Sequence, residues 1–224
     1  MKKRNLRLER ERLRREKNKR YILKAAEKVF IQKGFGRARM DEIAREAQFS
    51  KATLYRYFRS KSEMFAEIIF NAFEDSYQRI RMIREKPDPA EKRLLDLIRF
   101  VLLFYRKKQN LTRIVYFEKS ALKDILKTEL RIQNRGKPCH PRIPDRFMTI
   151  IKQSAALVAE ILQDGVESGE FRKMDVSQAS MVLGALLRGF QFRGPLEERH
   201  EPVAKTAELI HDFFLRGIRK PGKV

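Results

Sequence analysis

The sequence has no tryptophan, a single cysteine and no long apolar run. One cysteine, Cys139, cannot form an intrachain disulfide, so nothing indicates a disulfide-stabilised secreted protein. The longest apolar stretches, such as Phe100–Tyr105 and Ala155–Ala159, are far shorter than the roughly 20 residues that a membrane-spanning helix needs. The basic N-terminus lacks the apolar segment of a signal peptide. These absences predict a cytoplasmic protein with no membrane partner.

Motifs of common enzyme classes are missing as well. The chain contains no P-loop, no G-x-S-x-G, no H-E-x-x-H and no G-x-G-x-x-G. Cys139 and His140 are adjacent, which invites a metal or redox interpretation, but two ligands in a proline-rich segment are too few. A plain surface loop is the simpler interpretation. We therefore expect no enzyme activity, no cofactor and no metal site.

Positive charge is what the sequence has in excess. Lys and Arg number 51 against 29 Asp and Glu, which gives a net charge of +22 over 224 residues. Residues 1–61 hold 21 basic and seven acidic residues, whereas residues 62–224 hold 30 and 22. So large an imbalance favours a polyanionic partner, and its concentration near the N-terminus predicts a DNA-binding head on a more neutral body.

The apolar pattern is helical throughout, and no segment alternates as a strand does. It predicts an all-α protein whose first helix ends at Gly34 and Gly36. Short helices are expected over 40–47 and 51–57, and a capping box at Ser60 begins a long helix to about residue 84. Asp88 is expected to cap the next helix, with Pro89 at its first position. Further helices are predicted over about 89–108, 110–132, 145–168, 175–192 and 202–219, with a loop over 133–144.

Three short helices in the first sixty residues, with a tight connection before the third, predict a helix-turn-helix head. Leu54 and Phe58 are expected to point inward, and the rest of the third helix outward. Cationic side chains suit phosphates, hydroxyl groups donate neutral hydrogen bonds, and side chains near the helix start reach base edges. The alternative is that the tyrosines only pack and the lysines are only solvated. The outward residues are Lys51, Ala52, Thr53, Tyr55, Arg56 and Tyr57.

Residues 39–61, R-M-D-E-I-A-R-E-A-Q-F-S-K-A-T-L-Y-R-Y-F-R-S-K, resemble the DNA-binding head of TetR/AcrR transcriptional regulators. Residues 25–35 and 60–65 resemble the flanking helices of that head. The remainder matches only in helical layout, including G-V-E-S-G-E-F at 165–171. The resemblance implies a homeodomain-like helix-turn-helix head followed by a helical bundle that binds a ligand and dimerises.

The resemblance also implies roles for single residues. Positions matching Lys51, Ala52 and Tyr55 usually face the major groove in this family. Positions matching four others usually contact phosphates: Arg39, Thr53, Tyr57 and Lys61.

Two residues depart from the family pattern. The family usually has glycine where Gln48 stands and often glycine where Ala52 stands. A left-handed backbone at Gln48 or a slightly altered turn is therefore expected. The methyl group of Ala52 either meets a thymine methyl group or narrows the fit to the groove.

We divide the chain into a basic arm (1–19), a helix-turn-helix DNA-binding domain (20–64) and an effector-binding and dimerisation domain (65–224). Residues 1–20 carry 11 basic and three acidic residues. Such a charge run is either a solvated extension or an arm that touches DNA.

The last two helices carry apolar faces that a second copy of the chain could cover, which predicts a homodimer. The residues expected to mediate it are Val182, Leu186, Phe190, Ile210, Phe213 and Phe214. Aromatic residues in the middle of the chain either fill the core or line an effector pocket. The pocket candidates are Phe104, Tyr105, Tyr116 and Phe117.

These features favour a ligand-responsive DNA-binding transcriptional regulator, most simply a repressor. A small-molecule effector would release it from an inverted-repeat operator in double-stranded DNA. An effector-independent DNA-binding or architectural protein with a helical dimerisation body is the alternative, and a helical enzyme fits least. A body of about 150 residues exceeds what dimerisation alone requires, which favours the first interpretation.

Overall fold

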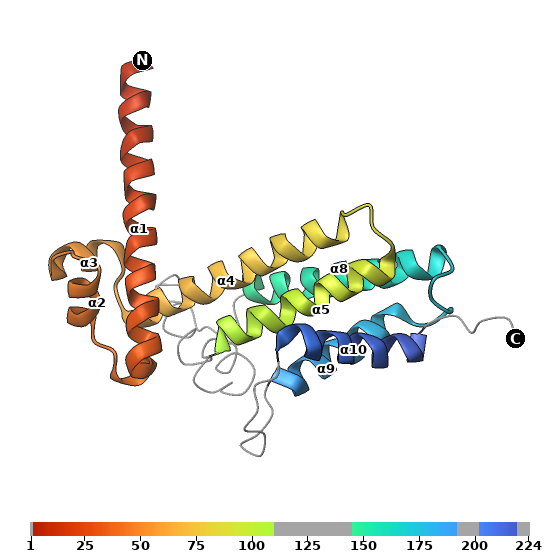
Figure 1. The fold of residues 1–224 in the computed structure, drawn as a ribbon. Helices are drawn as coiled ribbons and strands as arrows, with labels where there is room; N and C mark the ends of the chain where they lie inside the picture. The colour runs from red at the N-terminus through yellow and green to blue at the C-terminus, as the bar shows by residue number, and fades with distance from the viewer. Residues whose placement is uncertain (1, 110–144, 192–201, 219–224) are drawn as a thin grey trace, which may run out of the picture. The chain divides into compact units, whose positions relative to one another are not determined.

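The computed structural model describes residues 2–109, 145–191 and 202–218. Within these ranges the chain forms eight α-helices and no strand, which confirms the all-α prediction (Figure 1). The described residues fall into two compact units, a head unit of residues up to Asn71 and a body unit that begins at Ala72. The division lies within helix α4 (Lys61–Arg84), which therefore contributes residues to both units.

The head unit consists of α1 (Lys2–Arg37), α2 (Met40–Glu46), α3 (Lys51–Tyr57) and the first part of α4. Each helix contributes apolar residues to one core, as the helical spacing predicted. In α1 the apolar residues at positions 22, 23, 25, 26, 29 and 30 share one face and are all buried. The core includes Ile22, Leu23, Ala25, Ala26, Val29, Phe30, Ile43, Ala44, Leu54, Phe58, Met64 and Phe65.

Helix α1 is longer than the apolar pattern indicated. Its buried apolar face begins only at Ile22, but the helix itself begins at Lys2, so residues 2–19, which we call the arm, are helical. The arm contains i,i+4 ion pairs, Arg7 with Glu11 at 3.5 Å and Arg12 with Glu16 at 3.2 Å. Extending a helix that a buried segment already holds avoids the free-energy cost of nucleating a new helix. The i,i+4 ion pairs add modest stability.

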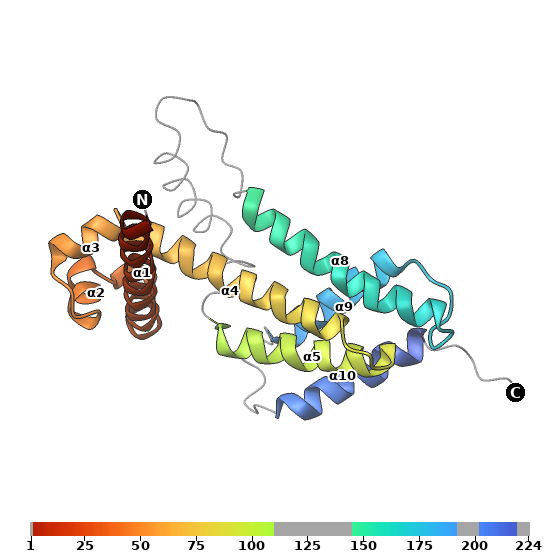
Figure 2. The ribbon, with the colours of Figure 1, turned by 90° about the horizontal axis from the view of Figure 1, so that it is seen from above.

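The body unit is built around α5 (Ala90–Lys107). This helix packs against α8 (Asp145–Glu167), α9 (Val176–Gln191) and α10 (Val203–Ile218), as Figure 2 shows. Its buried face meets apolar residues from all three neighbours. The core includes Leu94, Leu97, Ile98, Leu102, Ile161, Leu162, Leu183, Ala207, Ile210 and Phe214.

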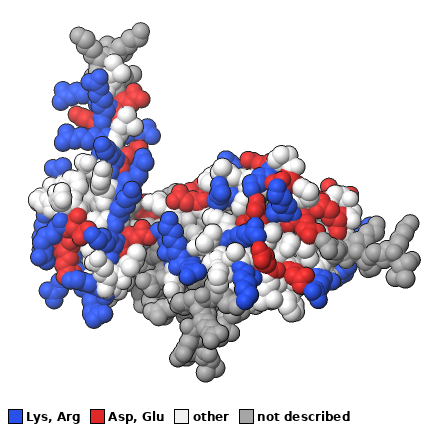
Figure 3. Space-filling model, viewed as in Figure 1, with Lys and Arg blue, Asp and Glu red and all other residues white. Residues whose placement is uncertain are grey.

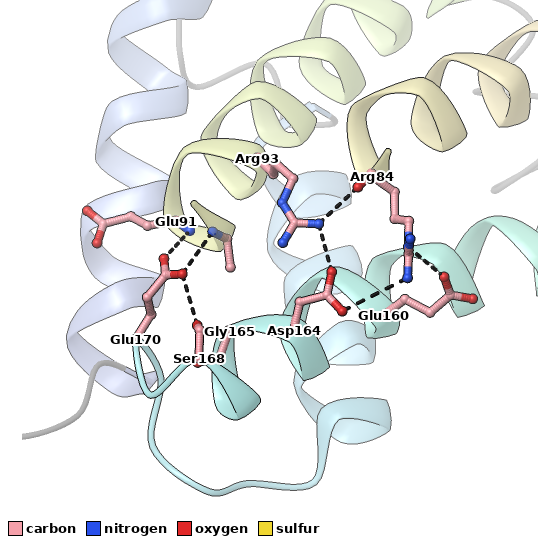
Figure 4. Close-up of polar contacts among 9 residues, drawn as sticks. Arg84, Glu91, Arg93, Glu160, Asp164, Gly165, Ser168 and Glu170 are labelled. Atoms are coloured by element: carbon pink, nitrogen blue, oxygen red, sulfur yellow. Dashed lines mark hydrogen bonds and ion pairs between the residues drawn. The ribbon is translucent and has the colours of Figure 1, made fainter. Parts of the chain in front are cut away.

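The start of α5 corrects one sequence prediction. The helix begins at Ala90, Pro89 is the residue before it, and Asp88 instead forms an ion pair with Lys92 at 2.8 Å. The cap comes from a distant residue (Figure 4). The two carboxylate oxygens of Glu170 accept hydrogen bonds from the N–H groups of Ala90 at 3.1 Å and Glu91 at 3.0 Å. A carboxylate at this place also complements the helix dipole.

Burial alone would raise the pKa of the Glu170 carboxyl. The backbone N–H groups of Glu91 and Ala90, the hydroxyl of Ser168 and the charge of Arg93 outweigh that effect and bring the pKa below its usual value. Both carboxylate oxygens accept hydrogen bonds from backbone N–H groups, so the ionised form is the one that caps α5.

Further contacts hold the end of α8 against α5 and against the residues that follow α8. The guanidinium of Arg93, which is 8% exposed, donates to Asp164 at 2.7 Å and to the carbonyl of Arg84 at 2.9 Å (Figure 4). Gly165 lies under the ring of Phe171, where an added Cβ would be 2.2 Å from a ring carbon. The residues that follow α8, as far as Phe171, are thus packed back onto its last turn.

The remaining described helices follow the predicted ranges closely. Helix α8 ends just before Gly169, whose φ is +78°, and the Asp175 carboxylate caps α9 by accepting from Ser177 and Gln178. The helix predicted over 110–132 and the loop predicted over 133–144 lie outside the described residues.

Candidate nucleic-acid interface

The connection between α2 and α3 is a helix C-cap with a left-handed residue. The N–H of Phe49 donates to the carbonyl of Ala44 at 3.0 Å, and the N–H of Gln48 donates to Arg45 at 3.1 Å. This is the Schellman arrangement, in which the left-handed position usually holds glycine. Gln48 has φ of +57° and is alone among the described non-glycine residues in having a positive φ. Of the two alternatives expected at Gln48, the structure has the left-handed backbone.

Helix α3 has the bounds that the sequence predicted. Ser50 begins it, and its hydroxyl accepts a hydrogen bond from the N–H of Thr53 at 3.1 Å. Leu54 and Phe58 are buried and hold the helix on the core. The opposite face is outward: Lys51, Ala52, Tyr55 and Arg56 are exposed, and Thr53 and Tyr57 are half-buried.

Lys51 has an acidic neighbour. Its ammonium lies 2.8 Å from the carboxylate of Asp41 on α2, and both side chains are exposed. The hydrogen bond and charge of Asp41 raise the pKa of Lys51 above its usual value. Lys51 is therefore charged at neutral pH, but the negative charge of Asp41 partly offsets its positive charge.

Arg39 stands immediately before α2 and is exposed. Its backbone N–H donates to the Glu42 carboxylate at 3.1 Å, and the Lys33 ammonium donates to the same side chain. These two hydrogen bonds, that of Lys33 foremost, lower the pKa of Glu42. The Arg39 backbone is thus fixed beside α1 while its guanidinium is presented to solvent.

Lys61 differs from the other predicted phosphate contacts. Its ammonium donates to the carbonyls of Phe35 at 2.9 Å, Gly36 at 2.8 Å and Ala38 at 3.1 Å. Helix α1 is interrupted at Gly34, where φ is +74°, and these carbonyls follow the interruption. All three ammonium donors are therefore used within the protein. Lys61 holds the segment that joins α1 to α2, a role that spacing along the chain did not indicate.

Tyr57 connects α3 with the arm. Its hydroxyl accepts a hydrogen bond from the side-chain amide of Asn18 at 3.0 Å. One residue further, the Lys19 ammonium donates to Glu67 at 2.8 Å. Lys and Arg side chains run along the projecting part of α1 and recur over α2 and α3 (Figure 3). Asn18 was not among the predicted site residues. The one signal in the sequence that could have indicated it is its position one helical turn before the first core residues.

The effector-pocket candidates are only partly described. Tyr105 is buried, and Phe104 packs against the Phe73 ring with a centroid distance of 5.7 Å. Phe73 in turn contacts Phe147 at 5.0 Å. Both candidates therefore belong to the aromatic part of the body core. The other two, Tyr116 and Phe117, lie outside the described residues.

The six dimerisation candidates separate into two groups. Ile210 and Phe214 are buried within the body core. Val182 and Phe213 are 54% and 69% exposed, and Leu186 and Phe190 are half-buried. All six line a groove of about 690 Å³ between α9 and α10. An open apolar groove is what a second copy would cover.

No helix in the described ranges combines the length and apolarity that a membrane span requires. No group of three or more His, Cys, Asp or Glu side chains there is arranged to hold a metal ion. Cys139 and His140 lie outside these ranges.

An exposed cationic helix on a three-helix head, joined to a separate helical body, defines a helix-turn-helix DNA-binding regulator. Residues 22–68 match the family model described as bacterial regulatory proteins, tetR family. The chain is 31% identical over 188 residues to the uncharacterized HTH-type transcriptional regulator YdgC of Bacillus subtilis, covering 77% of this chain and 92% of that protein. The protein belongs to the tetR family of transcriptional regulators and is not an enzyme.

Two further comparisons extend the likeness over most of the chain. The HTH-type transcriptional repressor NicS of Pseudomonas putida is 23% identical over 216 residues, covering 89% of this chain and 91% of that protein. A putative transcriptional regulator from Saccharomonospora viridis, solved in complex with choline, superposes with a TM-score of 0.73 at 21% identity. That match covers 92% of this chain and all of the other, and it shows a shared fold.

Proposed function

We propose that the protein is a dimeric, ligand-responsive repressor that binds an inverted-repeat operator in the cytoplasm. The observation that carries the proposal is the outward face of α3, which presents cationic, hydroxyl and small side chains on a helix fixed by buried Leu54 and Phe58. Relatives that include a named repressor, NicS, support the direction of regulation.

The α3 face divides into two kinds of DNA contact. Lys51, Ala52 and Tyr55 lie on the exposed face from the start of the helix and are assigned to base edges in the major groove. Thr53 and Tyr57, being half-buried at the flanks, are assigned to phosphates, and Arg39 joins them from the start of α2. Lys61 is assigned a positioning role instead, because its donors bind backbone carbonyls.

The α9–α10 groove supports the dimer. Its exposed apolar members, Val182 and Phe213, would be covered if the same groove of a second copy packed against it around a two-fold axis. Two heads related by that axis read two half-sites, so the operator is an inverted repeat.

The body unit is where an effector would act. A protein of the same fold was solved with choline, which supports binding of a small molecule by this protein. A ligand changes DNA affinity only by its different affinity for the free and DNA-bound states. Choline is therefore a first probe, followed by other small metabolites.

Selection from a pool of random duplex DNA tests the central claim. The expected product is an inverted repeat bound by a dimer, with a Lys51→Ala/Tyr55→Ala variant that no longer selects it. A monomer in light scattering at micromolar concentration would disprove the dimer. Repression of a reporter that carries the selected site tests the sign of regulation. Reporter repression that no added metabolite relieves would favour the effector-independent alternative.

A further inference from the structure

The arm leaves the head unit at a fixed place. Residues 22–30 of α1 are anchored in the core, and the same helix continues back through the arm without interruption. Two side-chain bonds fasten it where it leaves, Asn18 to the Tyr57 hydroxyl and Lys19 to Glu67. The Lys19 ammonium also lies 5.6 Å from the centre of the Phe58 ring. The arm is therefore held beside the last turn of α3.

A polar hollow of about 480 Å³ lies between the arm and α3. Glu11, Asn18 and two arginines supply one wall, since positions 11, 14, 15 and 18 share a face of the helix. Two α3 residues complete it. The lining is Glu11, Arg14, Arg15, Asn18, Arg56 and Tyr57.

The charges of this hollow are not balanced within the head. Arg14, Arg15 and Arg56 form no ion pair or side-chain hydrogen bond with any other described residue. The acidic residue of the lining, Glu11, is already paired with Arg7 at 3.5 Å. Three arginines thus line one polar hollow without an ion pair to another described residue, and their guanidinium groups are available to an anion that binds there.

We propose that this hollow binds a backbone phosphate of duplex DNA, next to the groove that α3 enters. Guanidinium groups bind phosphate oxygens in a forked, bidentate geometry, which three arginines around one hollow can provide. The Tyr57 hydroxyl, whose oxygen accepts from Asn18, keeps its proton to donate to the same phosphate. The site rests on the proposed DNA-binding function and adds a phosphate beyond the contacts of α3 itself.

The arm and the recognition helix therefore act as one site. Asn18 is a positioning residue, because it ties the arm to Tyr57 without carrying charge. Free inorganic phosphate offers the same oxygens as a phosphodiester. Duplex DNA is the favoured source because the hollow shares Arg56 and Tyr57 with the DNA-facing helix.

The test compares two variants that each remove two positive charges from the arm. Arg14→Ala/Arg15→Ala alters the hollow, whereas the control Arg12→Ala/Lys17→Ala alters residues outside its lining. Affinity for the selected operator and for random duplex is measured from 50 to 300 mM salt. At 100 mM salt the hollow variant is expected to bind both duplexes about tenfold more weakly, with a log–log salt slope reduced by about one for each phosphate that it no longer neutralises. The control is expected to change affinity by less than about threefold.

Two more variants separate a placed site from diffuse charge. Arg56→Ala is expected to lower DNA affinity less in the Arg14→Ala/Arg15→Ala variant than in the wild type. The reason is that all three arginines bind the same phosphate. Asn18→Ala changes no charge and is expected to weaken DNA binding as well. Inorganic phosphate is the competing probe, compared with chloride at equal ionic strength. Specific competition by millimolar phosphate would assign the hollow to the free anion.

These experiments distinguish failure of the phosphate site from failure of the proposed DNA-binding function. If the wild-type protein binds no duplex, the DNA-binding function itself fails. If it binds duplex and the hollow variant and its control weaken binding equally, the phosphate site alone is overturned. Circular dichroism confirms that each variant is folded, which is expected because Arg14 and Arg15 are exposed.

Discussion

The ammonium of Lys61 donates to the carbonyl of Phe35 and also lies 4.9 Å from the centre of the Phe35 ring. One side chain therefore caps the end of the first helix and covers an aromatic residue of the same turn. The sequence resemblance implied a phosphate contact at this position, whereas in the structure the half-buried Lys61 directs its ammonium to backbone carbonyls.

Replacing Lys61 by Met tests that assignment. The Met side chain keeps the apolar contact with Phe35 but leaves three carbonyls without their charged donor. We expect unfolding free energy to fall by about 1–3 kcal/mol, because hydrogen bonds to charged groups are the stronger ones. Urea denaturation measures the decrease. Lys24→Met, on an exposed position of α1, is the control. A stable Lys61→Met protein whose DNA salt slope falls by about one would restore the phosphate role.

Gln48 is expected to be a site of relievable strain. Its φ of +57° is costly for a residue with a Cβ, and glycine adopts it freely. Gln48→Gly should stabilise the protein by roughly 0.5–1 kcal/mol, since the relief exceeds the extra freedom of glycine in the unfolded chain. Gln48→Ala retains the strain and serves as the matched control. Thermal unfolding that ranks Ala above Gly would contradict the explanation.

Asp41 is expected to restrain DNA affinity. Its carboxylate is 2.8 Å from the Lys51 ammonium and would stand close to any phosphate that Lys51 approaches. Asp41→Asn removes the negative charge and releases Lys51, so binding to operator and random duplex should tighten several-fold at low salt. Fluorescence anisotropy at 50 and 200 mM salt measures both. Unchanged affinity at low salt would show that Lys51 does not approach DNA.

Glu170 makes the stability of the body depend on pH. Its pKa is lowered in the folded state, so the cap contributes its full stability above the ordinary glutamate pKa of about 4.3 and loses it as the pH falls through the lower folded value. Glu170→Gln should cost about 1–2 kcal/mol at pH 7 and much less at pH 3. Urea denaturation of both proteins at pH 7, 5 and 3 measures this. If the difference in unfolding free energy between the two proteins were the same at every pH, the ionised cap would be disproved.

Gly165 is expected to tolerate no side chain. A Cβ there would lie 2.2 Å from the Phe171 ring and 3.0 Å from Ala90. Gly165→Ala should therefore destabilise the protein by about 1–3 kcal/mol through overpacking. Gly189→Ala in α9 is the control, because nothing lies within 4 Å of its added Cβ. The control should be neutral or slightly stabilising, as alanine is in a helix. Equal melting temperatures for the two variants would argue against close packing at Gly165.

Local signals in the sequence predicted much of the head. The bounds of α3 follow from residues within a few positions of one another, whereas the left-handed Gln48 was expected from the family resemblance. The buried faces of α1 and α3 follow from helical spacing. Contacts between distant residues did not follow, because spacing along one helix carries no information about what packs against it.

Three contacts in the structure could not be predicted from the sequence. The cap of α5 by Glu170 joins residues 80 positions apart, so the nearer Asp88 looked like the cap. The carbonyl partners of Lys61 depend on how α1 breaks at Gly34. The bond from Asn18 to Tyr57 depends on the arm being helical, which composition allowed but did not establish.

The distance along the chain between α5 and its cap has a consequence for synthesis. A ribosome delivers the chain from its N-terminus, so α5 emerges long before Glu170 does. Until residue 170 is available, the first N–H groups of α5 have no carboxylate to bind and Arg93 has no Asp164. The body unit can therefore complete its packing only late in translation. Chains that end before the α8–α9 connection should remain open to chaperones and proteases.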